Sequence, residues 1–470
     1  MKKAVLLISA FSLCLVSAAQ QNMTLYQMHN ILQSNSLNPA IASECRWNVG
    51  VPLLGGVSFA ASTPMAYNTS GAGQETFDVD GILSSLKSTN LVSSNAGVNL
   101  LMLGYRTENL YFQFNVNERA SFSASVPEDL VKILFAGNSP YVGKKLNQSV
   151  SVSGMHYREY ALSAALGIDD DTWIGLRGRL LFGRLSVMGV RNNVSVYTDP
   201  STYNLDIESD MLMRVSIPSK EVNAADSGWI KGFSADLTPG HFIMNPSNLG
   251  GALDIGLNKR FESGLNLSAS ILNLGMLKWK RHAHTFAKKH KKTYSAPFED
   301  FSVKSLTDTV KYMLQLKDDG ETTAYSQWLA PTLMFGLSYP VAEYVRLGVT
   351  GYGEFNSSGV PWALTLTAMT DNISNVYGAL SYTVTNNSFV NIGAGIGVQL
   401  GPVALHAFTD NLISVFSPFT QKYAAVQLGI NLKFGCEEDD GYGRNSGRRS
   451  KYRSIPCPSF SQRKPCPSRR

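Results

Sequence analysis

The segment 278–292, KWKRHAHTFAKKHKK, is the densest group of chemically active side chains. It holds seven Lys/Arg and three of the chain's seven histidines. The cations could bind phosphates such as those of lipopolysaccharide, and His282 and His284 could bind a metal ion. No nearby Asp, Glu or Cys completes a four-ligand set, so a solvated outer loop is the favoured interpretation. The basic residues of this expected loop are Lys280, Arg281, Lys288, Lys289, Lys291 and Lys292.

A second group of charged residues falls on the polar face of segments that alternate polar and apolar residues. If these segments form a closed barrel, the charges face its lumen. They would then form either a polar pathway for a substrate or an internal salt-bridge network that fills the lumen. The network is favoured, because charges inside a barrel must pair or meet water. The group consists of Arg177, Arg179, Asp254, Arg346, Glu354 and Lys433.

Motifs of known catalytic chemistry do not occur in the sequence. It has no GxSxG, no Walker loop and no HExxH. A lipid-hydrolysing Ser/His pair could use His156 or His406, but such a site is defined by geometry and not by residue type. The sequence therefore predicts neither an enzyme nor a bound cofactor.

Transmembrane strands are the elements that would position these residues. In YAAVQLGINLKF, residues 423–434, Ala424, Val426, Leu428 and the following even positions are apolar, and the odd positions are small or polar. A period of two over about ten residues is typical of a strand that faces lipid on one side and a lumen on the other. The same pattern recurs at 173–181, 252–260, 345–354, 361–369 and 391–400.

Composition and connection lengths favour a barrel over a soluble sandwich. Only 16% of the residues are charged, glycine occurs 40 times, and the polar faces carry mostly Gly, Ser, Thr and Asn. No apolar run reaches the 18 or so residues of a spanning helix. Short turns alternate with long loops at 62–94, 127–147, 219–250, 281–327 and 411–421. We therefore predict an all-β, closed antiparallel barrel of about 14–16 strands in the cell outer membrane, with both termini in the periplasm.

The chain divides into four parts. Lys2, Lys3, an apolar run and Ser17-Ala18-Ala19 predict a signal peptide over 1–19. An N-terminal periplasmic segment follows over 20–45, then the barrel over 46–435 and a tail over 436–470. Short helices are expected at 127–137 and 301–316, within the outer loops.

Four cysteines remain after removal of the signal peptide, in an oxidising compartment. Cys45 immediately precedes the first expected strand and Cys436 follows the last. Closing a barrel with an even number of strands brings these positions together on the periplasmic rim. The sequence thus predicts a Cys45–Cys436 disulfide, which leaves Cys457 to pair with Cys466.

The C-terminal tail carries the basic character of the chain. From Cys436 onward, nine Lys/Arg face four Asp/Glu, which gives the tail a net charge of +5. The body is then near neutral, which argues against nucleic-acid binding. The tail could bind anionic cell-wall polymer, lipid headgroups or a periplasmic protein partner, or act only as a solubilising extension. Its basic residues include Arg444, Arg448, Arg449, Lys451 and Arg453.

Several stretches resemble an uncharacterised family of bacteroidete outer-membrane barrels: SNSLNPAIAS (34–43), GLRGRLLFG (175–183), 250–280 and GAGIGVQLGPVALHAFTDNL (393–412). The Asn38-Pro39-Ala40 element is also similar to type IX secretion membrane proteins and long-chain fatty-acid channels. The resemblance implies a plug at the periplasmic mouth and a transport or secretion-accessory role. Two functions follow: an envelope or secretion accessory protein with a partner-binding tail, or a channel for small hydrophobic or amphipathic molecules. A continuous lumen with a lateral gap would favour the channel, and a lumen plugged by residues 20–45 and paired charges would favour the accessory role.

Overall fold

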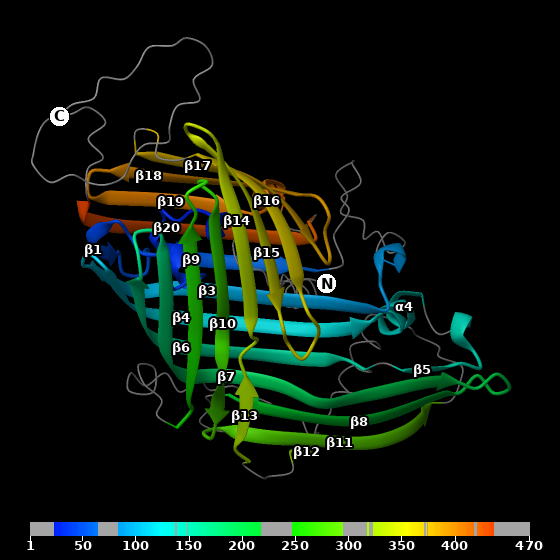
Figure 1. Cartoon of the computed structure of the whole chain (residues 1–470). Coiled ribbons are helices and arrows are strands. Elements are labelled where there is room, and N and C mark those ends of the chain that lie inside the picture. Colours follow the sequence, from blue (N-terminus) through cyan, green and yellow to red (C-terminus); the bar gives the residue numbers. More distant parts are fainter. Residues whose placement is uncertain are drawn as a thin grey trace, which may run out of the picture. The chain divides into compact units, whose positions relative to one another are not determined.

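Hydrogen bonds between the first and last strands close a single sheet into an antiparallel barrel of 14 strands (Figure 1). This fold confirms the predicted class and the lower end of the expected strand number. The computed structural model describes residues 23–63, 83–136, 139–147, 149–217, 247–294, 317–318, 323–370, 373, 375–417 and 421–436. The predicted signal peptide, the helix at 301–316, the Cys457–Cys466 pair and the basic tail lie outside these residues.

The barrel strands follow one another around the wall nearly in chain order. The first strand is formed by two pieces, which both pair with the last strand and with the second strand. The wall consists of β1 (Cys45–Gly50) with β2 (Val57–Ser62), β3 (Thr89–Arg106), β4 (Leu110–Pro127), β6 (Ser151–Gly167), β7 (Thr172–Thr198), β9 (Leu249–Arg260), β10 (Asn266–Trp279), β14 (Thr332–Ala342), β15 (Val345–Glu354), β16 (Trp362–Thr370), β17 (Val376–Thr385), β18 (Asn391–Leu400), β19 (Val403–Thr409) and β20 (Tyr423–Cys436).

Alternation of side chains gives the wall an apolar outside and a polar inside. On β16, Trp362, Leu364 and Leu366 are 43–53% exposed, whereas Thr365 and Thr367 are buried. Strands with period two place successive side chains on opposite faces, so the sequence pattern becomes a difference between the two surfaces. In a water-soluble protein, the polar residues would be outside.

Two strands depart from the simple pattern that the sequence predicts. The expected first strand is interrupted, because residues 51–56 loop out between β1 and β2 while β3 and β20 continue beside both pieces. β7 is 27 residues long. Its first part pairs with β9, and its second part leaves the barrel and pairs with β8 (Leu205–Ser216).

The β7–β8 extension also accounts for the expected basic loop at 278–292, and here the loop assignment is wrong. Lys288, Lys289, Lys291 and Lys292 lie in a strand, β11 (Ala283–Tyr294), which pairs with β8 over its whole length (Figure 1). The extended β8 offers β11 a free edge for pairing. Lys291 on β11 forms an ion pair with Glu208 on β8 at 2.8 Å. Only Lys280 and Arg281 remain in the connection from β10.

Small elements complete the described part of the chain. One helix matches the expectation from residues 127–137, and in the parts that the structure describes no helix has the length and apolar character needed to cross a membrane. These elements are α2 (Met23–Tyr26), η1 (Leu32–Ser36), α4 (Glu128–Ala136), η2 (Ser139–Tyr141), α7 (Leu412–Phe416), β5 (Lys145–Asn147), β12 (Lys317–Asp318) and β13 (Tyr325–Trp328).

Candidate functional site in the barrel lumen

Residues 23–44, called the plug below, lie inside the barrel. The apolar side chains of the plug, among them Met23, Leu25 and Tyr26, are fully buried and pack against wall residues such as Met334 and Phe408. Burying side chains of this size contributes about 1.5–3 kcal/mol each. The plug therefore has a hydrophobic core in common with the wall.

Asp410, at the end of β19, holds the beginning of the plug. Its carboxylate accepts hydrogen bonds from the backbone N–H groups of Met23 and Thr24 at 2.8 and 2.9 Å, and from the Thr24 hydroxyl at 2.6 Å. The Tyr423 hydroxyl donates a fourth bond at 2.9 Å. Asp410 is fully buried, and four donors offset the cost of removing its polar atoms from water.

The Asn38-Pro39-Ala40 turn is fixed against β7, β9 and β10. Asn38 Nδ2 donates to the carbonyl of Leu257 at 3.0 Å and to Ser268 Oγ at 2.8 Å, and Asn38 Oδ1 accepts from Ala40 N at 2.9 Å. The wall is stripped of side chains here: a Cβ at Gly175 would lie 2.2 Å from the Pro39 carbonyl carbon, and one at Gly256 would lie 2.0 Å from Asn38 Oδ1. Only glycine lets the plug backbone approach so closely.

Charged residues of β4, β6, β7 and β9 form an ion network beside this turn. Arg177 Nε donates to Asp254 Oδ2 at 2.6 Å, and Arg179 bridges Asp254 Oδ1 at 2.8 Å and Glu159 Oε2 at 3.0 Å. Arg119 Nε donates to Glu159 Oε1 at 2.7 Å. The terminal nitrogens of Arg177 donate to the plug carbonyls of Asn35 and Ser36 at 2.9 and 2.8 Å. The network therefore ties three guanidinium groups and two carboxylates to the plug.

The other expected lumenal charges do not join this network. Lys433 Nζ donates to the plug carbonyl of Asn30 at 2.7 Å. Arg346 lies near His29 of the plug, and burial together with the positive charges of Arg346 and Arg260 lowers the pKa of His29 to about 4. Glu354 lies at the end of β15, where it accepts a hydrogen bond from Tyr352 Oη at 2.6 Å. The six predicted residues thus lie in four separate places.

Above the plug the lumen contains a cavity of about 520 Å³, called the chamber below. Gln33, Ser36 and Leu37 of the plug line its floor. The loop after β15 contributes to its lining, and Ser358 of that loop lies 3.3 Å, oxygen to oxygen, from both Ser123 on β4 and Ser151 on β6. This loop therefore reaches across the lumen above the chamber.

Amides dominate the polar lining of the chamber. Asn117 Nδ2 donates to Glu159 Oε1 and Asn99 Nδ2 donates to Asn117 Oδ1, both at 2.7 Å, and Gln113 Nε2 donates to Asn115 Oδ1 at 3.2 Å. Met102, Met188, Leu272 and Leu329 add apolar surface. The chamber can therefore offer both hydrogen-bonding groups and apolar contact to one small molecule.

Several of these residues escaped the sequence analysis. Asn115, Asn117 and Arg119 alternate along β4, and the same period of two along β6 would have placed Glu159 in the lumen. Asp410 follows the end of a strand, and no local pattern marks it. Among the described residues, no group of three or more His, Cys, Asp or Glu could hold a metal ion.

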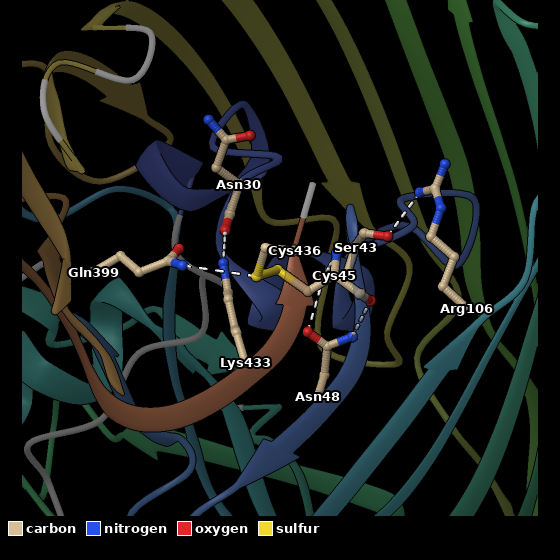
Figure 2. The surroundings of a disulfide bond; sticks show 8 residues. All are labelled: Asn30, Ser43, Cys45, Asn48, Arg106, Gln399, Lys433 and Cys436. Carbon is tan, nitrogen blue, oxygen red and sulfur yellow. Dashed lines mark hydrogen bonds between the residues drawn. A yellow bond between two sulfur atoms is a disulfide. The ribbon is translucent and has the colours of Figure 1, made fainter. Parts of the chain in front are cut away.

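The predicted disulfide joins Cys45 to Cys436 at the ends of β1 and β20, with a Cα–Cα distance of 3.9 Å (Figure 2). Asn48 Nδ2 donates to the carbonyl of Cys45 at 3.0 Å, and Arg106 Nη1 donates to the carbonyl of Ser43 at 2.7 Å. Figure 2 shows Lys433 next to the disulfide and reaching Asn30. The covalent closure of the wall and the end of the plug are therefore neighbours.

Comparison with protein families assigns most of the chain to one family. A model described as "Family of unknown function (DUF5723)" matches residues 39–410. This range begins at Pro39 of the Asn38-Pro39-Ala40 turn and includes β1 and the ion network. The chain belongs to this family. This assignment confirms the resemblance to an uncharacterised barrel family. The comparison with curated proteins finds no match.

This member of the DUF5723 family also resembles solved barrels at low sequence identity. A Pseudomonas aeruginosa FadL homologue shares 9% identity over 89% of this chain and 99% of that chain, with a TM-score of 0.39. The Ralstonia pickettii toluene transporter TbuX shares 8% identity over 86% of this chain and 94% of that chain, with a TM-score of 0.36. The translocator domain of Neisseria meningitidis NalP shares 9% identity over 83% of this chain and 88% of that chain, with a TM-score of 0.29. All three TM-scores are below 0.5, so the function proposed below does not depend on these likenesses.

Proposed function

We propose that the protein spans the outer membrane and that its lumen is a gated route for small amphipathic molecules. The apolar outer face supports the membrane placement, because such a surface is stable in lipid and not in water. Exposed aromatic residues stand at both ends of the strands, as in the girdles of membrane barrels. They are Trp47, Phe261, Tyr339 and Tyr344 at the short-turn end, and Trp362 and Phe389 at the other.

The chamber is the single observation that carries the binding function. Its volume of about 520 Å³ falls within the roughly 300–1,000 Å³ of small-molecule sites. Amides and an arginine paired with a glutamate supply polar contacts, and methionine and leucine side chains supply apolar ones. A molecule with a short apolar part and a polar end fits this lining.

The plug makes the proposed route a gated one. It lies below the chamber and bonds to the wall through Asp410, Arg177, Ser268 and Lys433. A molecule can pass from the chamber to the short-turn end only if these bonds break or shift. The closed arrangement is therefore the resting state of the proposed channel.

Occupation of the chamber can be tested with a tryptophan that fills it. Ser121 faces the chamber on β4, and Phe112 on the same strand faces outward. We would follow the binding of octanoate labelled with nitrobenzoxadiazole by its fluorescence anisotropy, with the unmodified protein and both variants in the same detergent. We expect Ser121→Trp to weaken binding at least tenfold and the control Phe112→Trp to leave it unchanged. Equal affinity of both variants and the unmodified protein would refute the proposed site.

A second proposal is an accessory role through the basic tail. Two features of the lumen favour it: the plug closes it, and the charges of Arg177, Arg179, Asp254 and Glu159 are paired. The net charge of +5 over 436–470 suits an acidic periplasmic partner or cell-wall polymer. A crosslinked pull-down with and without residues 437–470 tests this role. A specific partner that disappears on truncation supports it, and an unchanged partner set contradicts it.

A further inference from the structure

Four polar residues form a cluster on the outward face of the barrel wall. Glu118 on β4 accepts hydrogen bonds from Arg158 Nε at 2.6 Å and forms a contact with His156 Nε2 at 3.1 Å. Arg184, in the bulge of β7 beside the shift at His156, interacts electrostatically with Glu118 and Arg158. Among the described residues, this outer cluster thus contains two guanidinium groups and one carboxylate, a net positive charge.

Below the outer cluster the same strands are apolar on their outward face. Leu162, Leu166, Leu176 and Leu180 are 43–57% exposed. Tyr160 and Phe182 lie between these leucines and the cluster, with their rings edge to face at 5.4 Å. β4 covers about nine residues from Leu110 to Glu118, enough for a tilted strand to cross a hydrocarbon layer.

Beyond the outer cluster, the β7–β8–β11 extension carries exposed charged pairs. On the β7–β8–β11 extension, Arg191 pairs with Asp210 at 3.3 Å, and Lys145 and Lys291 both pair with Glu208 at 2.8 Å. The three lysine and arginine side chains of these pairs are more than half exposed. The outer cluster therefore lies between the exposed leucines and these charged pairs.

We propose that Arg158, Arg184 and His156 bind a phosphate group of an outer-leaflet glycolipid, whose acyl chains cover the leucines below. Guanidinium groups present a planar set of donors that match phosphate oxygens, and an aromatic residue such as Tyr160 is typical of the headgroup level. The site lies on the outside of the wall and does not involve the chamber. It rests on the membrane placement proposed above and is independent of the gated route.

Native mass spectrometry of the full chain in detergent would test this site. We would add lipid A with two phosphates, lipid A without phosphate, and phosphatidylglycerol. We expect the bisphosphorylated form to bind at least tenfold more tightly than the other two. Equal affinity for lipid A with and without phosphates, or equal affinity for phosphatidylglycerol, would overturn the assignment.

Matched variants locate the binding on the wall. Arg184→Gln keeps the Arg158–Glu118 pair and should fold, and the double variant Arg158→Gln/Arg184→Gln removes both guanidinium groups. We expect at least a threefold loss of lipid A binding for the first and a tenfold loss for the second. Arg191→Gln on the same strand serves as the control and should bind as the unmodified protein does. Unchanged binding by Arg184→Gln, with heat-modifiable migration showing a folded barrel, would overturn the proposal even if the double variant does not fold.

The outcome is separable from that of the proposed route. Anisotropy of the labelled octanoate reports on the chamber, and lipid A binding reports on the outer face. Loss of lipid binding in Arg184→Gln with unchanged octanoate binding supports the outer site whatever the result for the chamber. Loss of both in this variant would point to a global defect and count against the assignment.

Discussion

Arg177 and Asp254 face each other across β7 and β9, with Arg177 Nε 2.6 Å from Asp254 Oδ2. Both side chains are buried in the lumen. Because the two remaining nitrogens of Arg177 bind carbonyls of the plug, this pair connects the wall to the segment that closes it.

Arg177→Lys should loosen the plug while the barrel stays folded. Lysine retains a positive charge for Asp254 but cannot present the planar fork that reaches Asn35 and Ser36 as well. We expect faster amide hydrogen exchange over residues 32–41 and more frequent opening in planar bilayers. Arg191→Lys is the control, because Arg191 forms an exposed ion pair with Asp210 on the extension. Exchange rates equal to those of the unmodified protein would show that Arg177 does not hold the plug.

Gly175→Ala should displace the Asn38-Pro39-Ala40 turn. The added Cβ would meet the Pro39 backbone at 2.2 Å, and backbone cannot move aside as a flexible side chain can. We expect proteolysis within the plug to increase at least tenfold. Gly178→Ala is the matched control on the same strand, since its Cβ would have nothing within 4 Å. A plug equally protected in both variants would contradict the packing described above.

Cys45→Ser/Cys436→Ser should destabilise the barrel without changing its fold. The disulfide closes a sequence separation of 391 residues, and a native disulfide typically contributes about 2–4 kcal/mol. The midpoint of urea unfolding, followed by heat-modifiable migration, should fall accordingly. Cys457→Ser/Cys466→Ser serves as the control, and peptide mapping without reductant should recover Cys45 joined to Cys436. An unchanged midpoint after loss of this pair would show that the Cys45–Cys436 disulfide does not stabilise the barrel.

His29→Gln should reduce the acid sensitivity of the plug. Burial and two nearby arginines lower the pKa of His29 from an ordinary value near 6.5 to about 4. The unfolded state therefore binds a proton that the folded state excludes, so stability is full above pH 6.5 and falls as the pH drops towards 4. The difference is on the order of 3 kcal/mol for a shift of this size.

The pH dependence can be isolated by comparison between variants. The rate of amide hydrogen exchange in the plug and the midpoint of urea unfolding would be measured between pH 7 and pH 4. Carboxylates titrate in this range in every variant, so only differences between variants report on His29. His29→Gln should lose less stability over this window than the unmodified protein, and His284→Gln should behave like the unmodified protein. Identical pH profiles for all three would mean that His29 is not the sensitive group.

Local pattern was sufficient for the wall. The alternation in 423–434 and 361–369 determines which residues face outward and which face the lumen, because each side chain's face depends only on its position in the strand. Strand order and even parity were sufficient for the Cys45–Cys436 pair. The loop assignment of 278–292 was based on its run of charges, and it was wrong because β11 pairs with the edge of the distant β8.

The sequence by itself determined a barrel with a polar interior, the disulfide between its first and last strands, and only part of the set of charges inside. Only the tertiary structure decided which of those charges meet. Arg179 reaches both Glu159 and Asp254 because β6, β7 and β9 pair in one register, and Asp410 holds Thr24 across a separation of 386 residues. Such contacts depend on the closure of the whole wall around the plug, and a period of two along one strand contains no information about them.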